Sequence, residues 1–329
     1  MKINRLLAAG MLLLSTLPQL QAGDKLKALI IDGQNNHSWK TTTPVLKWIL
    51  EESGRFTVDI STTPPSQRAA PVAPKADASP EQKAAQETAL AKWKEQTAAN
   101  AELWKQWRPV FKNYDVLVLN YNGQDWPEAV RSEFVAYIRD GGGLVIYHAA
   151  DNSFPNWPEF NEMIALGGWG GRNEKSGPMV RYRDGKVVLD NSPGAGGTHG
   201  RPSEFLVEIR DAEHPVTKGL PASWLHATDE LYSKLRGPAT NLTILATAHS
   251  SLTGENEPIL MVISFDKGRV FHTVLGHDPA AMVDIGFQAT LQRGAEWAAT
   301  GQVTLPAPKP EEMPSDKIVK REPPSIPTK

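Results

Sequence analysis

Short apolar runs that stop abruptly at a polar residue constrain the fold of this chain more than any other feature. They cover residues 26–31, 116–119 and 144–147, and a polar residue follows each of them at once. Such nearly continuous runs are typical of parallel strands that are buried on both faces. Amphipathic stretches that predict helices begin near Thr43 and at Glu128, between the runs. This alternation predicts an α/β domain with a doubly wound, mostly parallel sheet.

The second half of the chain adds further strands and a closing helix. Asp266-Lys-Gly268 has the composition of a hairpin turn. We expect the final helix over 283–298. The strands are expected over 205–209, 228–232, 242–247, 259–265 and 269–275.

Residues 62–108 form an insertion of different texture. The stretch up to Ser79 is rich in Pro and Ala, and the remainder has the Ala, Glu, Gln and Lys content of a helix. Its tryptophans could offer a sugar-stacking surface, or they could anchor the helix on the domain, which is the interpretation we favour. They are Trp93, Trp104 and Trp107.

Both ends of the chain differ from the domain between them, which we place at 23–303. Residues 1–22 have the charged start, apolar centre and small final residue of a secretory signal peptide. Residues 304–329 are rich in Pro and charge and predict a disordered tail. We therefore expect a periplasmic or secreted protein with no stable membrane anchor after cleavage of the signal. The formal net charge of -2 argues against nucleic acid as a partner.

Histidines mark the ends of several predicted strands. His37, His148 and His277 each follow an apolar run, and His199 lies in the glycine-rich stretch 194–200. In an open parallel sheet, ligands bind outside the carboxyl ends of the strands. A shared site for these imidazoles is therefore expected there, with His199 on a loop that could close over a ligand.

Acids accompany the histidines. Asp229 and Glu230 are adjacent on an extended segment and so face opposite ways, and Glu230 would share the face of Tyr232. Asp278 follows His277 and could orient its ring or begin a helix. We expect Glu230 to point into the site.

These residues do not by themselves decide whether the protein binds a cofactor. Imidazole and carboxylate ligands suit zinc and similar divalent metals, and His148, His199 and His277 are the candidates. No compact metal motif is present, so the metal is unknown at this point. The chain has 0 Cys and no Gly-x-Ser-x-Gly sequence, which argues against thiol or serine nucleophiles.

The order of these motifs resembles the ThuA-like (trehalose utilisation) family of the class I glutamine amidotransferase-like superfamily. The resemblance spans about residues 25–300. It implies a flavodoxin-like three-layer sandwich and a role in carbohydrate metabolism, on oxidised (3-keto) sugars or glycosides. The superfamily's nucleophilic cysteine sits where a strand meets the next helix, and His148 stands at the comparable place. The resemblance is carried by the first predicted strand with His37 in the polar loop that follows it, and by the segments 114–118, 141–150, 213–215, 229–232 and 268–278.

The resemblance and the residues together suggest an enzyme of hydrolase or lyase type. A base such as His148 or Glu230 would remove the proton beside the keto group, and His277 or a metal would assist. The outcome would be cleavage of the glycosidic bond by elimination and hydration, or isomerisation. The alternative is a non-catalytic exported carbohydrate-binding protein, and whether either forms a homo-oligomer is left open. A glycosidase with two carboxylates ranks last. Residues expected to bind the small carbohydrate ligand are His37, Asn36, Trp157, His199, Asp229, Tyr232 and Asp278.

Overall fold

The core of the molecule is a nine-stranded mixed sheet with the order β2-β1-β3-β4-β11-β10-β9-β7-β8. The structure is a computed structural model, which describes residues 25–67 and 69–324. A separate two-stranded sheet pairs β5 with β6. The strands are β1 (Leu26–Asp32), β2 (Phe56–Thr62), β3 (Val116–Leu119), β4 (Gly143–Tyr147), β5 (Met179–Arg183), β6 (Lys186–Asp190), β7 (Ser203–Ile209), β8 (Ser223–Asp229), β9 (Leu242–Ser250), β10 (Glu255–Phe265) and β11 (Gly268–Thr273).

Only half of the large sheet is parallel. The pairs β1–β2, β1–β3, β3–β4 and β4–β11 are parallel, as the apolar runs predict. From β11 outward, every pair through β10, β9 and β7 to β8 is antiparallel. The expectation of a mostly parallel sheet was therefore too broad. Short turns with no crossover helix join β9 to β10 and β10 to β11, and such turns connect only antiparallel neighbours.

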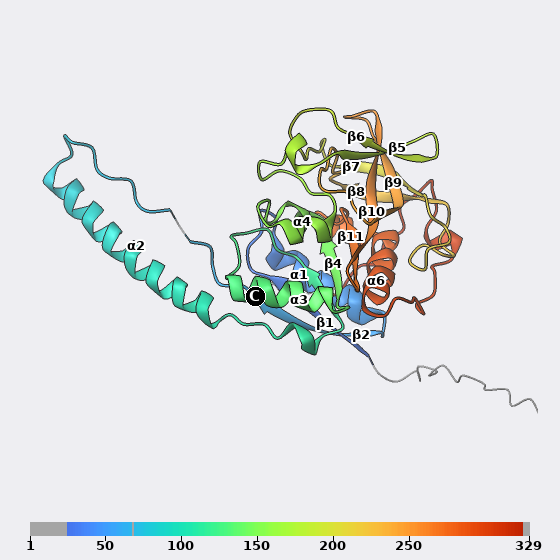
Figure 1. The fold of residues 1–329 in the computed structure, drawn as a ribbon, viewed down its shortest axis with the longest axis horizontal. Helices are drawn as coiled ribbons and strands as arrows, with labels where there is room; N and C mark the ends of the chain where they lie inside the picture. The colour runs from blue at the N-terminus through green and yellow to red at the C-terminus, as the bar shows by residue number, and fades with distance from the viewer. Residues whose placement is uncertain (1–24, 68, 325–329) are drawn as a thin grey trace, which may run out of the picture.

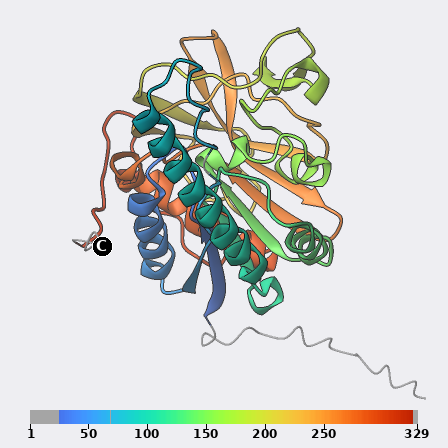
Figure 2. The same cartoon turned by 90° about the vertical axis from the view of Figure 1, so that its left-hand side faces the viewer.

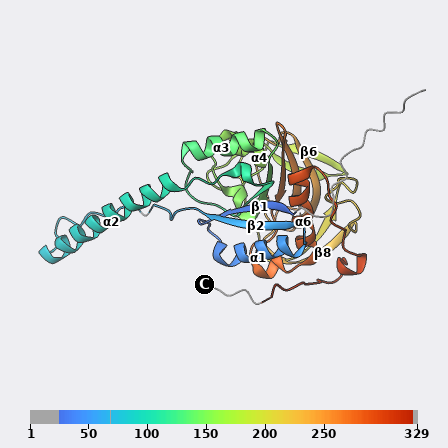
Figure 3. The same ribbon diagram turned by 90° about the horizontal axis from the view of Figure 1, so that it is seen from below.

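Helices cover both faces of the parallel half. Figure 3 shows α3 and α4 on one side of β1 and β2, and α1 on the other. Every residue of β3 and β4 is buried, as expected for strands between two helical layers. The helices are α1 (Trp39–Glu52), α2 (Pro80–Gln106), α3 (Glu128–Arg139), α4 (Pro158–Ile164), α5 (Pro279–Met282) and α6 (Ile285–Thr300), with short 3-10 helices η1 (Phe111–Asn113), η2 (His148–Asn152), η3 (Glu174–Ser176) and η4 (Pro310–Glu312).

The insertion forms an arm that extends from the domain. Its helix α2 points away from the sheet in Figure 1 and toward the viewer in Figure 2. At its base, the ring of Trp107 packs against Trp104 and Trp126, with centroids 5.6 and 5.3 Å away. Two of the three tryptophans therefore anchor the helix, while Trp93 lies farther out along the arm. Its extended segment also contacts the domain, since the N–H of Gln67 donates to Gln124 Oε1 at 2.9 Å.

The segment after residue 303 lies against the domain as far as it is described. Thr304 and Leu305 donate backbone hydrogen bonds to Glu296, and Met313 is buried. Residue 320 forms a β-bridge with Asp284. The expected disorder does not apply to 304–324, because the Pro-rich composition here belongs to an extended strap that buries apolar side chains. The expected signal peptide lies outside the described residues.

Within 25–67 and 69–324, no helix combines the length and the apolar character that crossing a membrane requires.

The strap should contribute to stability. Met313 is 2% exposed, so we expect Met313→Ala to lower the free energy of unfolding by about 2 kcal/mol or more, through lost burial and the cavity left behind. Chemical denaturation measures this. Glu311→Ala, at an exposed neighbour in the same strap, is the control and should change little. Equal stability of the two variants would contradict the packing of the strap.

Candidate active site

Four imidazoles surround one carboxylate at the carboxyl edge of the parallel strands. Glu230 follows β8, and its two carboxylate oxygens lie 3.4 to 3.7 Å from a ring nitrogen of each histidine. His37 follows β1, His148 follows β4, and His277 follows β11. His199 approaches from the glycine-rich loop before β7. The structure thus brings together the residues that the sequence marks at strand ends.

The rings are close to one another as well as to the carboxylate. The ring centroid of His37 lies 4.8 Å from that of His148 and 4.7 Å from that of His277, both edge to face. Three polar atoms of this cluster are buried and have no hydrogen-bond partner among the described residues: His37 Nδ1, His148 Nε2 and Glu230 Oε2. Buried polar atoms are rarely left unpaired, so the cluster is shaped for a group that it does not itself contain.

His148 occupies a strained position at the turn from β4 into η2. Its φ of 44° is a left-handed conformation that costs energy for any residue with a Cβ. Its Nδ1 lies 2.6 Å from the carbonyl oxygen of Val274, to which it donates. This bond fixes the orientation of the ring and turns Nε2 toward Glu230. The ring also packs against Tyr232, with centroids 4.3 Å apart and the two planes inclined at 34°.

Asp229 supports the site from behind. Its Oδ1 accepts hydrogen bonds from the backbone N–H groups of Glu230 (2.8 Å) and His277 (3.0 Å). Its Oδ2 accepts from the N–H of Gly276 at 2.6 Å and lies 2.9 Å from Nε2 of His226. The side chain is fully buried, so Asp229 holds the two site segments together and does not face the cavity.

Gly276 is required by this arrangement. Its φ is +96°, and an added Cβ would lie 2.7 Å from the Tyr147 ring and 2.8 Å from Phe287. A larger residue would therefore push the backbone N–H that bonds Asp229 out of place.

The residues of the cluster differ in how their surroundings shift their pKa values. Burial, helped by the neighbouring His148 and His277, lowers the pKa of His37 to about 4, so His37 is neutral at neutral pH. Burial also opposes protonation of His148, but the carboxylates of Glu230 and Asp229 outweigh it and raise the pKa of His148. Burial alone would raise the pKa of Glu230, yet the surrounding imidazoles lower it. The surroundings thus disfavour protonation of His37, favour protonation of His148 and favour the ionised form of Glu230.

A cavity of about 390 Å³ opens beside the cluster. Glu230, His37 and His199 form one side of it, and Tyr232 and Trp169 offer aromatic surface. Amide side chains complete the lining, since Asn36, Asn122 and Asn152 also border it. Asn122 and Asn152 were not singled out from the sequence, although they follow the predicted strands that stop at Asn120 and His148.

Three of the expected ligand-binding residues lie elsewhere. Asp229 is behind the cluster, as described above. Asp278 accepts hydrogen bonds from the N–H groups of Ala280 and Ala281 and so caps α5. Trp157 is buried, with its ring 5.3 Å from that of Phe154. His37, Asn36, His199 and Tyr232 do border the cavity.

A metal ion could be held by His37, Glu230 and His277. One ligand atom from each lies within 4.8 Å of the other two. Two imidazoles and a carboxylate form a ligand set known for catalytic zinc and non-haem iron sites. Of the histidines named as metal candidates from the sequence, only His277 belongs to this trio.

The fold and the site thus define an α/β domain with a cluster of imidazoles and one carboxylate at its strand ends. Comparison with known proteins shows the family to which this domain belongs. The model of the ThuA family, described as trehalose utilisation, matches residues 72–298. A ThuA-like protein from Parabacteroides merdae is 43% identical, with 91% of this chain and 98% of that one covered and a TM-score of 0.77. The chain therefore belongs to the ThuA family, a family linked to carbohydrate use.

A second ThuA-like protein, from Bacteroides uniformis, shares the fold at 20% identity, with a TM-score of 0.51 over 88% of this chain and 97% of that one. Among curated proteins, none matches this chain.

The buried contacts of His226 with Asp229 and Asp284 make the stability of the protein depend on pH. Burial opposes the charge on His226, but the two carboxylates prevail and raise its pKa from 6.5 to about 9. The stabilisation is complete below pH 6.5 and is lost as pH rises through 9. We expect the unfolding free energy to fall by an amount on the order of 1–3 kcal/mol over that window.

Urea unfolding between pH 6 and 10 tests this. His226→Gln should remove most of the dependence, whereas His249→Gln, at an exposed position on β9, should retain it. An unchanged pH profile in His226→Gln would refute the assignment.

Proposed function

We propose that the chain is an enzyme that acts on 3-keto-sugars or 3-keto-glycosides and cleaves the glycosidic bond by acid/base chemistry. The observation that carries the proposal is the contact of four imidazoles with Glu230 beside an open cavity. A cluster of titratable groups with shifted pKa values beside an open cavity is typical of a proton-transfer site. Membership of a trehalose-utilisation family supports a carbohydrate as the ligand.

The site also suits a divalent metal. The unpartnered buried oxygen of Glu230 fits a ligand that supplies positive charge, and Glu230 belongs to the trio with His37 and His277. A bound ion would act there as a Lewis acid that polarises the ketone of the substrate. Val274 keeps the ring of His148 in place behind Glu230 and so preserves the position of the carboxylate.

His199 is best placed to move protons. It borders the cavity, its side chain is 35% exposed, and its Nδ1 lies 3.7 Å from Glu230 Oε1. A ketone at C3 acidifies the proton on C2. In the proposed reaction His199 removes that proton, the C1–O bond breaks with its electron pair passing to the leaving oxygen, and the imidazolium returns the proton to that oxygen. Water then adds across the C1=C2 bond, so the sum is hydrolysis.

Glu230 and His277, which the sequence analysis expects to be catalytic, remain at the reacting centre in this proposal. His148, expected as a base, is instead assigned to positioning because its side chain is 2% exposed. We further propose export of the protein, on the signal-like residues 1–22.

Loss of the proton-transferring group should remove turnover. We expect His199→Ala to lower kcat on a 3-keto-glycoside by about 100-fold or more, the usual contribution of a general acid or base. Release of the aglycone measures the rate. His249→Ala is the matched control and should retain full activity. If the wild-type protein binds such glycosides but releases no product, the chain is instead a carbohydrate-binding protein.

Metal content gives a separate test. We expect the purified protein to retain a stoichiometric divalent metal, such as zinc, after dialysis, measured by elemental analysis. His277→Ala and Glu230→Gln should lose it, because each removes one of only three protein ligands. Glu213→Gln, at an exposed acid, should keep it. Wild-type protein that carries no metal, and whose turnover is unaffected by EDTA and by added zinc, would show that the cluster works without an ion.

A further inference from the structure

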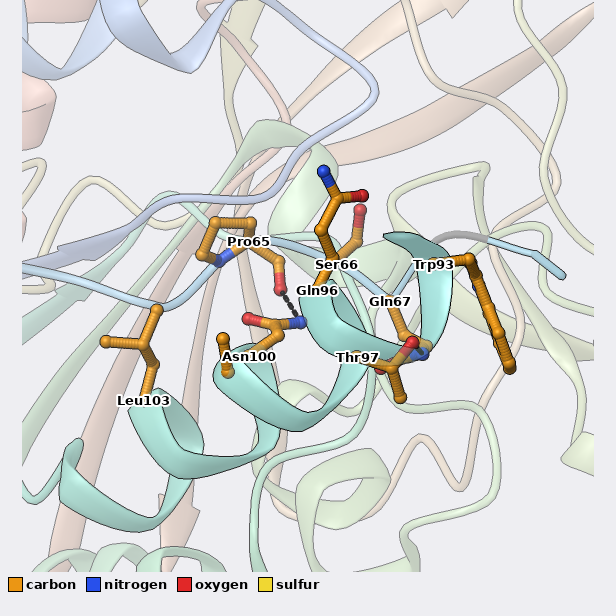
Figure 4. Close-up of a pocket in the computed structure, with 9 residues that line it drawn as sticks. Pro65, Ser66, Gln67, Trp93, Gln96, Thr97, Asn100 and Leu103 are labelled. Atoms are coloured by element: carbon orange, nitrogen blue, oxygen red, sulfur yellow. Dashed lines mark hydrogen bonds between the residues drawn. The ribbon is translucent and has the colours of Figure 1, made fainter. Parts of the chain in front are cut away.

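The site cavity adjoins a larger groove, with which it shares lining residues. Asn36 and Asn122 line both the cavity of about 390 Å³ and an adjoining one of about 760 Å³. The larger one runs past Trp39 to Pro65 and Ser66. These two residues also border a third cavity of about 320 Å³ on the arm, which Figure 4 shows between the extended segment and α2. The cluster thus lies at one end of a row of three neighbouring cavities.

The chemistry of the groove favours an uncharged, hydroxyl-rich ligand. Amides are the most frequent kind of side chain in its lining, and among the described residues that border it only Lys40 is charged. Amides donate and accept hydrogen bonds, as sugar hydroxyls do. Trp39 adds a half-buried aromatic ring, which combines apolar surface with a polar edge. The amides are those of Gln34, Asn35, Asn36, Asn122 and Gln124.

The floor of the groove is preformed. Gln34 is nearly buried, its Oε1 accepts from the N–H of Gln124 at 3.0 Å, and its Nε2 donates to the carbonyl of Pro64 at 2.8 Å. Gly123 lies so close that an added Cβ would be 2.5 Å from Gln34. Three loops, after β1, β2 and β3, are therefore tied together, which lowers the cost of ordering them when a ligand binds.

A pair of asparagines marks the junction between cavity and groove. Asn122 Nδ2 donates to Asn36 Oδ1 at 2.6 Å. That bond occupies one end of each amide group and orients the other, so Asn36 keeps its NH₂ and Asn122 its oxygen for a ligand. A ligand that spans the two cavities would pass directly over this pair.

From these observations we infer that the groove binds the second sugar ring of a disaccharide, with the ring that reacts held in the site cavity. Trp39 would contact the face of the second ring, and Asn36 and Asn122 would hydrogen-bond near the linkage. The assignment of the reacting ring rests on the proposed function. The groove itself does not, because its recognition requires no turnover.

Binding of unoxidised sugars tests the groove apart from catalysis. Wild-type protein is titrated calorimetrically with glucose and with trehalose, maltose and cellobiose. We expect at least one disaccharide to bind about tenfold or more tightly than glucose, the gain from one well-packed additional contact. Trp39→Ala should abolish that difference and leave glucose binding unchanged, and Trp39→Phe should preserve most of it.

Trp93→Ala is the matched control, since Trp93 borders the arm cavity and not the groove, and it should bind the disaccharide as the wild type does. Asn122→Ala, at a loop position that borders both cavities, provides a second variant and should also weaken disaccharide binding. Equal affinities for glucose and all disaccharides, no disaccharide binding, or equal losses for both sugars in Trp39→Ala would overturn the inference. Failure of turnover with intact disaccharide preference would refute the proposed function alone.

Discussion

The buried carboxylate of Asp229 is the interaction on which the candidate site depends. It accepts hydrogen bonds from backbone N–H groups of Glu230, Gly276 and His277, so one side chain sets the positions of two segments that are distant in sequence. Burial of the carboxylate costs energy, but the partner His226 and the backbone donors lower the pKa of Asp229 and keep it ionised. Removal of this charge would weaken the hydrogen bonds that hold the backbones of Glu230 and His277 in position.

The cluster in front of Asp229 has the opposite character. Four imidazoles compete for one carboxylate, and buried nitrogen and oxygen atoms of His37, His148 and Glu230 lack hydrogen-bond partners within the described chain. His148 adds a strained backbone at φ 44°. Local rules of stability are usually broken where function requires it, and the stable frame behind compensates for the cost. The contrast between the two layers is the physical reason to regard the front layer as the reacting centre.

Much of this arrangement could be predicted from the sequence, because an apolar run fixes a strand and its end fixes an edge of the sheet. His37, His148 and His277 were found in that way, and the alternation of Asp229 and Glu230 correctly directed Glu230 inward. The sequence could not show that the side chains of Asp278 and Trp157 lie outside the cavity. An aspartate that caps a helix and a tryptophan in the core look the same in a sequence as residues that bind a ligand. The hairpin turn at 266–268 correctly indicated the antiparallel pair of β10 and β11. The other antiparallel pairs were not predicted, because an apolar run does not by itself show the direction of the neighbouring strand.

That antiparallel half determines how Glu230 reaches the site. In the sheet order, three strands separate β8 from β11, yet the residues that follow β8 hydrogen-bond through Asp229 to the loop after β11. A flat sheet would hold these ends well over ten ångströms apart, since neighbouring strands are about 4.8 Å apart. The twist of the strands and the reach of the loop after β11 together bring these two ends into contact. The carboxylate and the imidazoles thus come from opposite halves of the sheet, so the twist of the sheet governs their spacing as directly as the site residues do.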